Sequence, residues 1–325
     1  MRTHPSRTVA YLLCALVSFA ASTAEAEIYP SKYVTIIVSG AAGGGIDVIA
    51  RIVADRLTRS WGQQVLVADR PGGGGLISAQ AAAMAAPDGH TLYAAAASTF
   101  VVMPEIRTKL PFDLKHAFVP VALIGELPIT IAVAPSLKVN TLSELISLAR
   151  QNPEKIQYAA NSPGSLPHLT GELLRKRTDI NATFIPYPGA SQALQDIMGG
   201  RLAMIVESIS GISGALGDGS LRVLAVGSAT RLRNFPQLPT VAETVPGFVA
   251  VGWLALVAPT GTPETIIQKI NRDLNLILDE PEVRQKLETL GTYARPISPA
   301  ETGEFILGEQ LRWRPVVQQA GLAPQ

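Results

Sequence analysis

The feature of this sequence that most restricts its fold is a repeated alternation of short β-branched runs with amphipathic helical patterns. Residues 33–38 predict a buried strand, and the apolar residues that follow recur at helical spacing until Gly62 ends the pattern. The alternation predicts further strands at residues 64–69, 90–97, 128–135, 156–160, 182–187, 202–208, 221–228 and 252–259, with helices in between. Such an order favours an α/β fold with a largely parallel sheet and helices on its faces.

The alternation falls into two α/β units, separated by a proline-rich stretch at residues 104–120. A length of 325 residues also fits about two domains. The closing part predicts one strand and long helices from residue 264 to 320, which is too little sheet for a third domain. We therefore expect it to pack back onto the first unit. Pro315 predicts a break in the last helix.

The first 26 residues have the layout of a cleavable secretory signal. Arg2 and Arg7 precede an apolar run at residues 9–21, and small residues end it at Ala24 and Ala26. We therefore expect a signal peptide at residues 1–26 and a mature chain that begins near Glu27, outside the cytoplasm. The only cysteine of the sequence, Cys14, falls inside the signal. Disulfides and thiolate metal sites are thereby excluded from the mature chain.

Charge excludes another class of partner. Removing residues 1–26 takes Arg2 and Arg7 from 27 basic residues and Glu25 from 26 acidic ones, which leaves 25 of each. The charges are scattered along the chain rather than gathered into basic blocks. We therefore expect no nucleic acid partner.

The loop after the first strand, SGAAGGGIDVIAR at residues 39–51, is rich in glycine and leads into a helix. Three interpretations fit it. A cofactor phosphate is one, although the spacing gives neither G-x-G-x-x-G nor a G-K-[ST] motif. A tight turn without a ligand is the second. The third is an anion site of backbone N–H groups at the helix start, where a carboxylate would serve. Asp47 would stabilise this helix with or without a ligand.

No catalytic or metal-binding constellation is present in the sequence. Outside the signal the histidines are His90, His116 and His168, and neither G-x-S-x-G nor H-E-x-x-H occurs. His168 begins a helix and could contact a ligand, although a packing or capping role fits as well. We therefore expect no catalytic residue, no metal and no cofactor.

A second loop, NSPGSLPHLTGE at residues 161–172, follows a strand of the second unit as the glycine loop follows a strand of the first. Asn161, Ser162 and Ser165 offer hydrogen-bonding side chains beside a helix start, either for a ligand or for ordinary capping. The two loops could face each other across a cleft. A further cluster, RPGGGG at residues 70–75, predicts only a turn before a helix.

Taken in order, these segments resemble a known family. The series includes YPSKYVTIIVSGAAGGGIDVIAR, AAPDGHTLYAAAAST, YAANSPGSLPHLTGELL, FIPYPGASQALQDIMGGRLAMIVES, PQLPTVAE and LVAPTGTP, from about Tyr29 to the C-terminus. It is similar to Bug-type (TctC-like) solute receptors of the tripartite tricarboxylate transporters. The resemblance implies a type II periplasmic-binding-protein fold, with residues 28–130 plus 250–325 in one domain and 131–249 in the other. It also implies a periplasmic monomer that is not an enzyme, and that delivers a small organic carboxylate to membrane permease subunits.

The resemblance also implies where the ligand lies. With Asp47 and His168 from the loops above, the expected ligand-binding residues are Ala42, Gly43, Gly44, Ser98, Thr99, Asn161, Ser162, Ser165, Glu207 and Ser208. Three positions depart from the family pattern: Ile46 replaces a hydroxyl residue, Pro188 replaces a lysine, and Glu207 replaces an aspartate. The loss of a hydroxyl at Ile46 and of a cation at Pro188 could mean a less polar ligand, a ligand with fewer charges, or weak binding.

Two other functions remain open at this stage. A receptor of this kind could report to a membrane signalling protein without transport, and deleting the permease would then leave uptake unchanged. An enzyme acting on a carboxylate could use the same α/β framework, since a fold does not fix a function. Turnover of a bound carboxylate would reveal it.

Overall fold

The computed structural model of the protein describes residues 29–152 and 156–322. The predicted signal peptide at residues 1–26, with Cys14, lies outside the described residues. None of the helices in the two ranges is both long and apolar enough to span a membrane.

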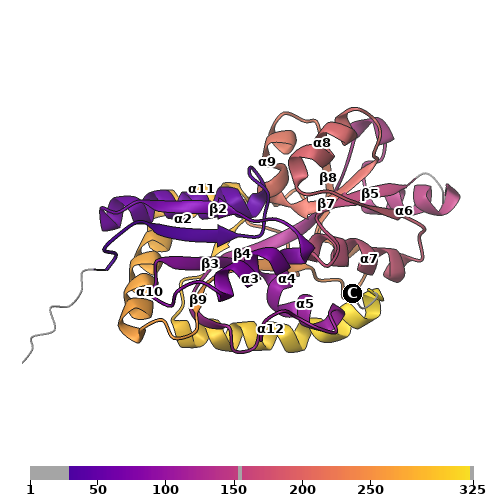
Figure 1. Cartoon of the computed structure of the whole chain (residues 1–325). Coiled ribbons are helices and arrows are strands. Elements are labelled where there is room, and N and C mark those ends of the chain that lie inside the picture. Colours follow the sequence, from indigo (N-terminus) through magenta and orange to yellow (C-terminus); the bar gives the residue numbers. More distant parts are fainter. Residues whose placement is uncertain (1–28, 153–155, 323–325) are drawn as a thin grey trace, which may run out of the picture.

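The chain alternates strands and helices over its whole described length (Figure 1). In order they are β1 (Val34–Val38), α2 (Gly45–Trp61), β2 (Val65–Asp69), η1 (Gly73–Gly75), α3 (Leu76–Ala83), β3 (Thr91–Ala96), α4 (Ala97–Val101), α5 (Met103–Ile106), β4 (Phe118–Val133), η2 (Pro135–Leu137), α6 (Leu142–Gln151), β5 (Gln157–Ala160), α7 (Leu166–Thr178), β6 (Thr183–Pro186), α8 (Ala190–Met198), β7 (Met204–Ser208), α9 (Ile209–Gly217), β8 (Arg222–Val226), η3 (Val241–Glu243), β9 (Val251–Pro259), α10 (Glu264–Asp279), α11 (Pro281–Thr289), β10 (Tyr293–Ala294) and α12 (Pro299–Ala320). The α/β class predicted from the alternation is confirmed.

The strands follow the order β2-β1-β3-β9-β4-β7-β5-β6, with β8 and β10 also paired to β4. β1 is parallel to β2 and β3, and β5 is parallel to β6 and β7. All pairs made by β4 and β9 are antiparallel, so the prediction of a largely parallel sheet was wrong. The physical reason is that an apolar run reports burial, whereas strand direction depends on which neighbour the chain returns to.

Strand β4 connects the two halves of the molecule (Figure 1). Residues 118–128 pair with β9, and residues 129–133 pair with β7 and β8. The sequence predicted a strand only from Pro128, because the stretch at residues 104–120 is rich in proline. The register shifts near Pro120 and between Leu123 and Gly125, and these irregularities let the strand continue. The expected domain boundary at residues 130 and 131 falls within β4.

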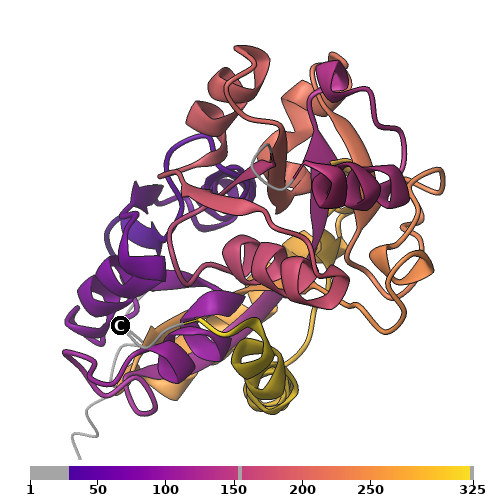
Figure 2. The ribbon, with the colours of Figure 1, turned by 90° about the vertical axis from the view of Figure 1, so that its right-hand side faces the viewer.

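Long helices near the C-terminus cover the first half of the sheet. α10 packs against α2 and β4, and α12 packs against β4 and against α7 (Figure 2). The predicted break at Pro315 was wrong, because α12 continues to Ala320. Pro315 lies on the exposed side of the helix, where water can replace the hydrogen bond that proline removes. Trp313 and Val317 on the opposite side are buried, so packing holds both turns in place.

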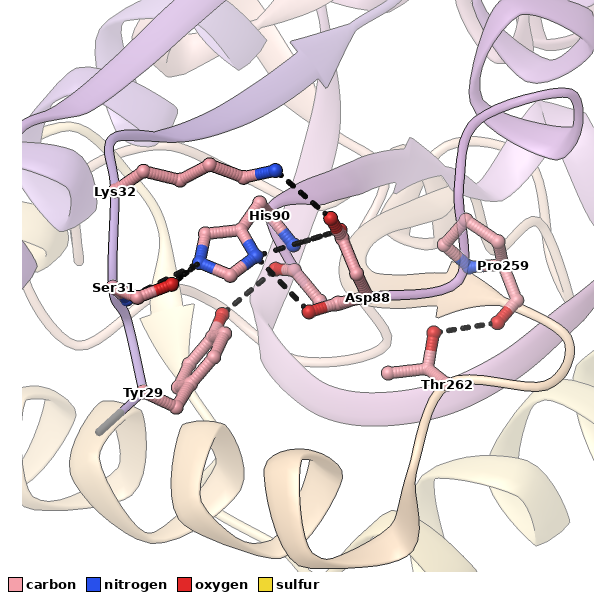
Figure 3. Close-up of polar contacts among 8 residues, drawn as sticks. Tyr29, Ser31, Lys32, Asp88, His90, Pro259 and Thr262 are labelled. Carbon is pink, nitrogen blue, oxygen red and sulfur yellow. Dashed lines mark hydrogen bonds and ion pairs between the residues drawn. The ribbon is translucent and has the colours of Figure 1, made fainter. Parts of the chain in front are cut away.

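The first described residues are held against the loop before β3 (Figure 3). The Tyr29 hydroxyl donates to the carbonyl of Gly89 at 2.7 Å, and Lys32 pairs with Asp88 at 3.0 Å. Burial raises the pKa of Tyr29. Gly89 has a φ of +80°, and a Cβ there would lie 2.9 Å from the Tyr29 ring. His90 packs on the same ring and so belongs to this structural contact.

Candidate functional site

One cavity of about 90 Å³ lies where the two halves of the molecule meet. Its wall is made by the starts of helices and by the two strands that pass between them. Residues from these segments line it: 39–41 and 44–46, 74–75, 96–98, 161–162 and 165–167, 188–190, 207–208, and, from β4 and β9, Leu127, Ile129 and 252–254. The volume is below the roughly 300–1,000 Å³ of pockets for drug-sized ligands. The cavity therefore suits a small molecule.

Five helices of eight residues or more begin at this cavity. All five N-cap residues belong to the lining: Gly44 for α2, Gly75 for α3, Ser165 for α7, Gly189 for α8 and Ser208 for α9. The first N–H groups of a helix have no partner within it, and the helix dipole makes this end positive. The convergence of five such ends gives the cavity a positive potential without a cationic side chain.

The two sides of the cavity are in close contact across it. A Cβ on Gly45 of α2 would overlap the Ser210 hydroxyl and lie 2.8 Å from Ser208 Oγ, both at the start of α9. On the other flank, a Cβ on Gly74 would lie 2.8 Å from the carbonyl oxygen of Pro163. The glycine loop thus meets the start of α9, the loop at residues 70–75 meets the serine-containing loop, and all of them line the one cavity.

Asp47 holds the glycine loop in place from a position outside the cavity lining. Its Oδ2 accepts a hydrogen bond from Gly43 N at 2.8 Å, and its Oδ1 lies 2.6 Å from Arg51 Nε. The Asp47 side chain is 4% exposed. Gly43 has a φ of +76°, which a residue with a side chain rarely adopts. The carboxylate therefore holds a loop conformation that glycine makes possible.

The structure brings most of the predicted ligand residues to the cavity. Gly44, Ser98, Asn161, Ser162, Ser165, Glu207 and Ser208 line it, and Ala42, Gly43, Asp47, Thr99 and His168 do not. Ala42 and Gly43 are exposed on the loop surface. Thr99 is turned to the Tyr93 hydroxyl, 2.8 Å away. Contact of these residues with a ligand remains a prediction.

Other lining residues were not among the predicted site. Ser39 stands in the glycine loop and could have been included for its hydroxyl. Gly74 and Gly75 come from the cluster that predicted only a turn. Leu127 and Trp253 gave no sequence signal, because they lie in apolar runs typical of buried strands. Their place in the wall follows from the pairing of β4 with β9.

His168 lies behind the cavity wall, where it stabilises the start of α7. Gly164 N donates to its Nδ1 at 3.2 Å, and its ring stacks on Phe184 with centroids 3.9 Å apart. Burial lowers the pKa of His168 to about 4. The ring is therefore neutral at neutral pH.

This arrangement predicts a loss of stability in acid that depends on His168. Since the folded protein holds the pKa below that of the unfolded chain, the unfolded state binds the proton more tightly. Stability from this group is therefore intact above about pH 6.5 and falls as the pH drops toward 4. In urea unfolding, the wild type should lose about 2 kcal/mol more than His168→Gln between pH 7.5 and 5.0. His116→Gln, at an exposed histidine, should behave as wild type. Equal losses in all three proteins would contradict the prediction.

The fold and cavity described above agree with a comparison to known families. The model of the tripartite tricarboxylate transporter family receptor matches residues 49–322. The chain belongs to this receptor family. The predicted resemblance to Bug-type receptors is confirmed by Protein BugT of Bordetella pertussis, which is 35% identical over 93% of each chain.

Solved structures place this receptor in the periplasmic-binding-protein fold. Rpa4515 of R. palustris, solved with adipate, is 32% identical with a TM-score of 0.88, over 91% of this chain and 100% of that one. MatC of Rhodopseudomonas palustris, solved with bound malate, is 30% identical with a TM-score of 0.83, over 89% of this chain and 100% of that one. The type II fold and the periplasmic solute-binding class are thereby confirmed.

Proposed function

We propose that this receptor binds a small organic carboxylate in the cavity between its two halves and delivers it to a membrane permease. The observation that carries the proposal is the convergence of five helix N-termini, with the hydroxyls of Ser98, Ser162 and Ser165, on one small cavity. Such a site compensates a carboxylate with N–H and O–H donors. The adipate and malate found in two relatives support the ligand class.

The proposal includes how the receptor reaches its ligand and closes on it. Residues 1–26 direct export to the periplasm and are removed. Residues 28–130 plus 250–325 form one domain and 131–249 the other, and a hinge motion closes them around the ligand. The receptor acts as a monomer and makes or breaks no bond in the ligand. The expected ligand-binding residues keep the roles given above, with Asp47 and His168 acting through the loops they hold.

The test is a thermal-shift screen of the chain from Glu27 onward against mono-, di- and tricarboxylates, aromatic acids, amino acids and nicotinamide. A ligand at a hundred times its dissociation constant adds about 2.7 kcal/mol to stability. We expect a shift with at least one carboxylate and its loss in Ser162→Leu, which fills the cavity. Ser143→Leu, at an exposed serine of α6, is the control and should keep the shift. No shift with any carboxylate, or a shift with nicotinamide only, would refute the proposal.

A further inference from the structure

A cluster of buried hydroxyl groups lies directly behind one wall of the cavity. Its centre is the hydroxyl of Tyr93 in β3, a residue that is fully buried and does not itself line the cavity. The hydroxyls of Thr99 and Ser78 lie 2.8 Å and 3.2 Å from it. Ser39 also hydrogen-bonds with it. One phenol therefore joins three segments of the first half that lie apart along the chain.

Each of these three segments also contributes to the cavity wall. Ser39 lines the cavity, and Thr99 follows Ser98, which lines it. Ser78 lies in the first turn of α3, whose N-cap Gly75 lines it as well. A Cβ on Gly75 would lie 3.2 Å from Thr99 Oγ1, so the cluster is packed against this N-cap. The wall and the hydroxyl cluster behind it thus form one packed unit.

The donors and acceptors of the cluster follow from the number of protons available. Ser78 Oγ donates its only proton to the carbonyl oxygen of Gly75 at 2.8 Å, so it can only accept from Tyr93. Tyr93 also has one proton and gives it to Ser78, so Thr99 donates to Tyr93. Burial raises the pKa of Tyr93, and the phenol therefore keeps this proton at neutral pH. The result is a chain of hydrogen bonds from the start of α4 to the N-cap of α3.

This chain matters for binding because the groups it holds are donors that would meet a carboxylate. The N-terminus of α3 offers backbone N–H groups, and Ser39 and Ser98 offer hydroxyls. Donors that are already in position bind more tightly, because no cost of ordering is subtracted from the binding free energy. The side chains of Tyr93, Ser78 and Thr99 are fully buried, so water cannot readily replace a bond that is removed.

We propose that Tyr93 is a positioning residue, which fixes the start of α3 and the hydroxyls of Ser39 and Ser98 in the arrangement that binds the ligand carboxylate. This inference rests on the proposed function and adds to it a residue outside the cavity that sets the affinity. In Tyr93→Phe the ring stays, with its contact to Phe118 at 5.7 Å between centroids. Only the hydroxyl that links the three segments is lost.

The test measures dissociation constants by calorimetric titration at pH 7.5, with malate, adipate, pyruvate and benzoate as probes. Tyr93→Phe should bind each probe that the wild type binds about tenfold more weakly. Ser78→Ala interrupts the same chain at its next member, where alanine is a better helix former, and it should also bind more weakly. Tyr29→Phe is the matched control, because it removes a hydroxyl hydrogen bond of 2.7 Å outside the cavity lining. It should bind as the wild type does.

A double-mutant cycle with Ser98→Ala separates positioning from a general loss of stability. If Tyr93 acts through this wall, the double variant should lose clearly less binding free energy than the two single variants together. The inference is overturned if the two losses add, if Tyr93→Phe keeps the wild-type affinity, or if Tyr29→Phe loses as much. Each of these results would still leave a carboxylate receptor.

Two further outcomes also decide the inference. If Tyr93→Phe does not fold, the same cycle is made with Ser78→Ala, and wild-type affinity or additive losses there overturn it. If the wild type binds none of the four probes, the inference fails. The separate carboxylate screen then decides the proposed function.

Discussion

Replacing Gly45 by alanine is expected to weaken ligand binding about a hundredfold while the unliganded protein stays about as stable as the wild type. Gly45 is the first residue of α2, where alanine is a better helix former than glycine. The added methyl group would overlap the Ser210 hydroxyl and lie 2.9 Å from the backbone nitrogen of Gly211. A side chain can rotate away from such a contact, but the backbone of α9 cannot. The cleft would therefore be held open by the width of a methyl group.

The magnitude follows from the share of molecules that can close. If closure is needed for binding and only about one molecule in a hundred reaches it, the apparent affinity drops by that factor. Calorimetric titration gives the affinity, and urea unfolding without ligand gives the stability. Gly214→Ala is the matched control, because it lies in α9 with nothing within 4 Å of the added Cβ. Wild-type affinity in Gly45→Ala would show that binding does not need the contact between α2 and α9.

The fold could be predicted from this sequence to the extent that it depends on local patterns. The helix α2 ends at Gly62, which adopts the left-handed conformation expected of a stop signal. The start of β4 was missed because the stretch that ends at Pro120 is rich in proline, while irregular pairing with β9 next to Pro120 lets the strand continue. Pro315 was given too much weight for a related reason, since the burial of Trp313 holds the helix together. In both cases tertiary contacts outweighed a local preference.

The candidate site, too, could be predicted only where it depends on local patterns. Loops that follow strands in an α/β fold carry sites, so Gly44, Asn161 and Ser162 could be chosen from the sequence. Their meeting at one cavity depends on pairing between strands that are distant along the chain. A single sequence does not show which of these strands pair. For the same reason Trp253 was missed, because a tryptophan in an apolar run is typical of a core. Thr99 was chosen from the resemblance to the receptor family, but its hydroxyl lies against Tyr93.

Asp47→Ala is expected to lower affinity about tenfold or more and the free energy of unfolding by about 1–3 kcal/mol. Asp47 does not line the cavity, so it would act as a positioning residue through the glycine loop. Its removal leaves Gly43 N without its acceptor and takes from Arg51 one of two carboxylate partners, while Asp69 remains at 3.0 Å. The loop would then lose the contact that fixes it before the ligand arrives. The binding free energy would then have to offset the cost of ordering this loop.

Two further variants distinguish this positioning role from a general loss of stability. Asp47→Asn keeps an oxygen that can accept from Gly43 N, and it should recover most of the affinity while the pairing with Arg51 stays weakened. Asp55→Ala removes an exposed carboxylate from the same helix, where it pairs with Arg59 at 3.0 Å, and it should change stability by less than about 1 kcal/mol. Affinity is measured by calorimetry at a temperature where all variants are folded. If Asp47→Asn binds as weakly as Asp47→Ala, the ion pair with Arg51 holds the loop, and the hydrogen bond to Gly43 does not. If Asp47→Ala binds as the wild type does, the loop is already ordered by its glycines and by the helix it begins.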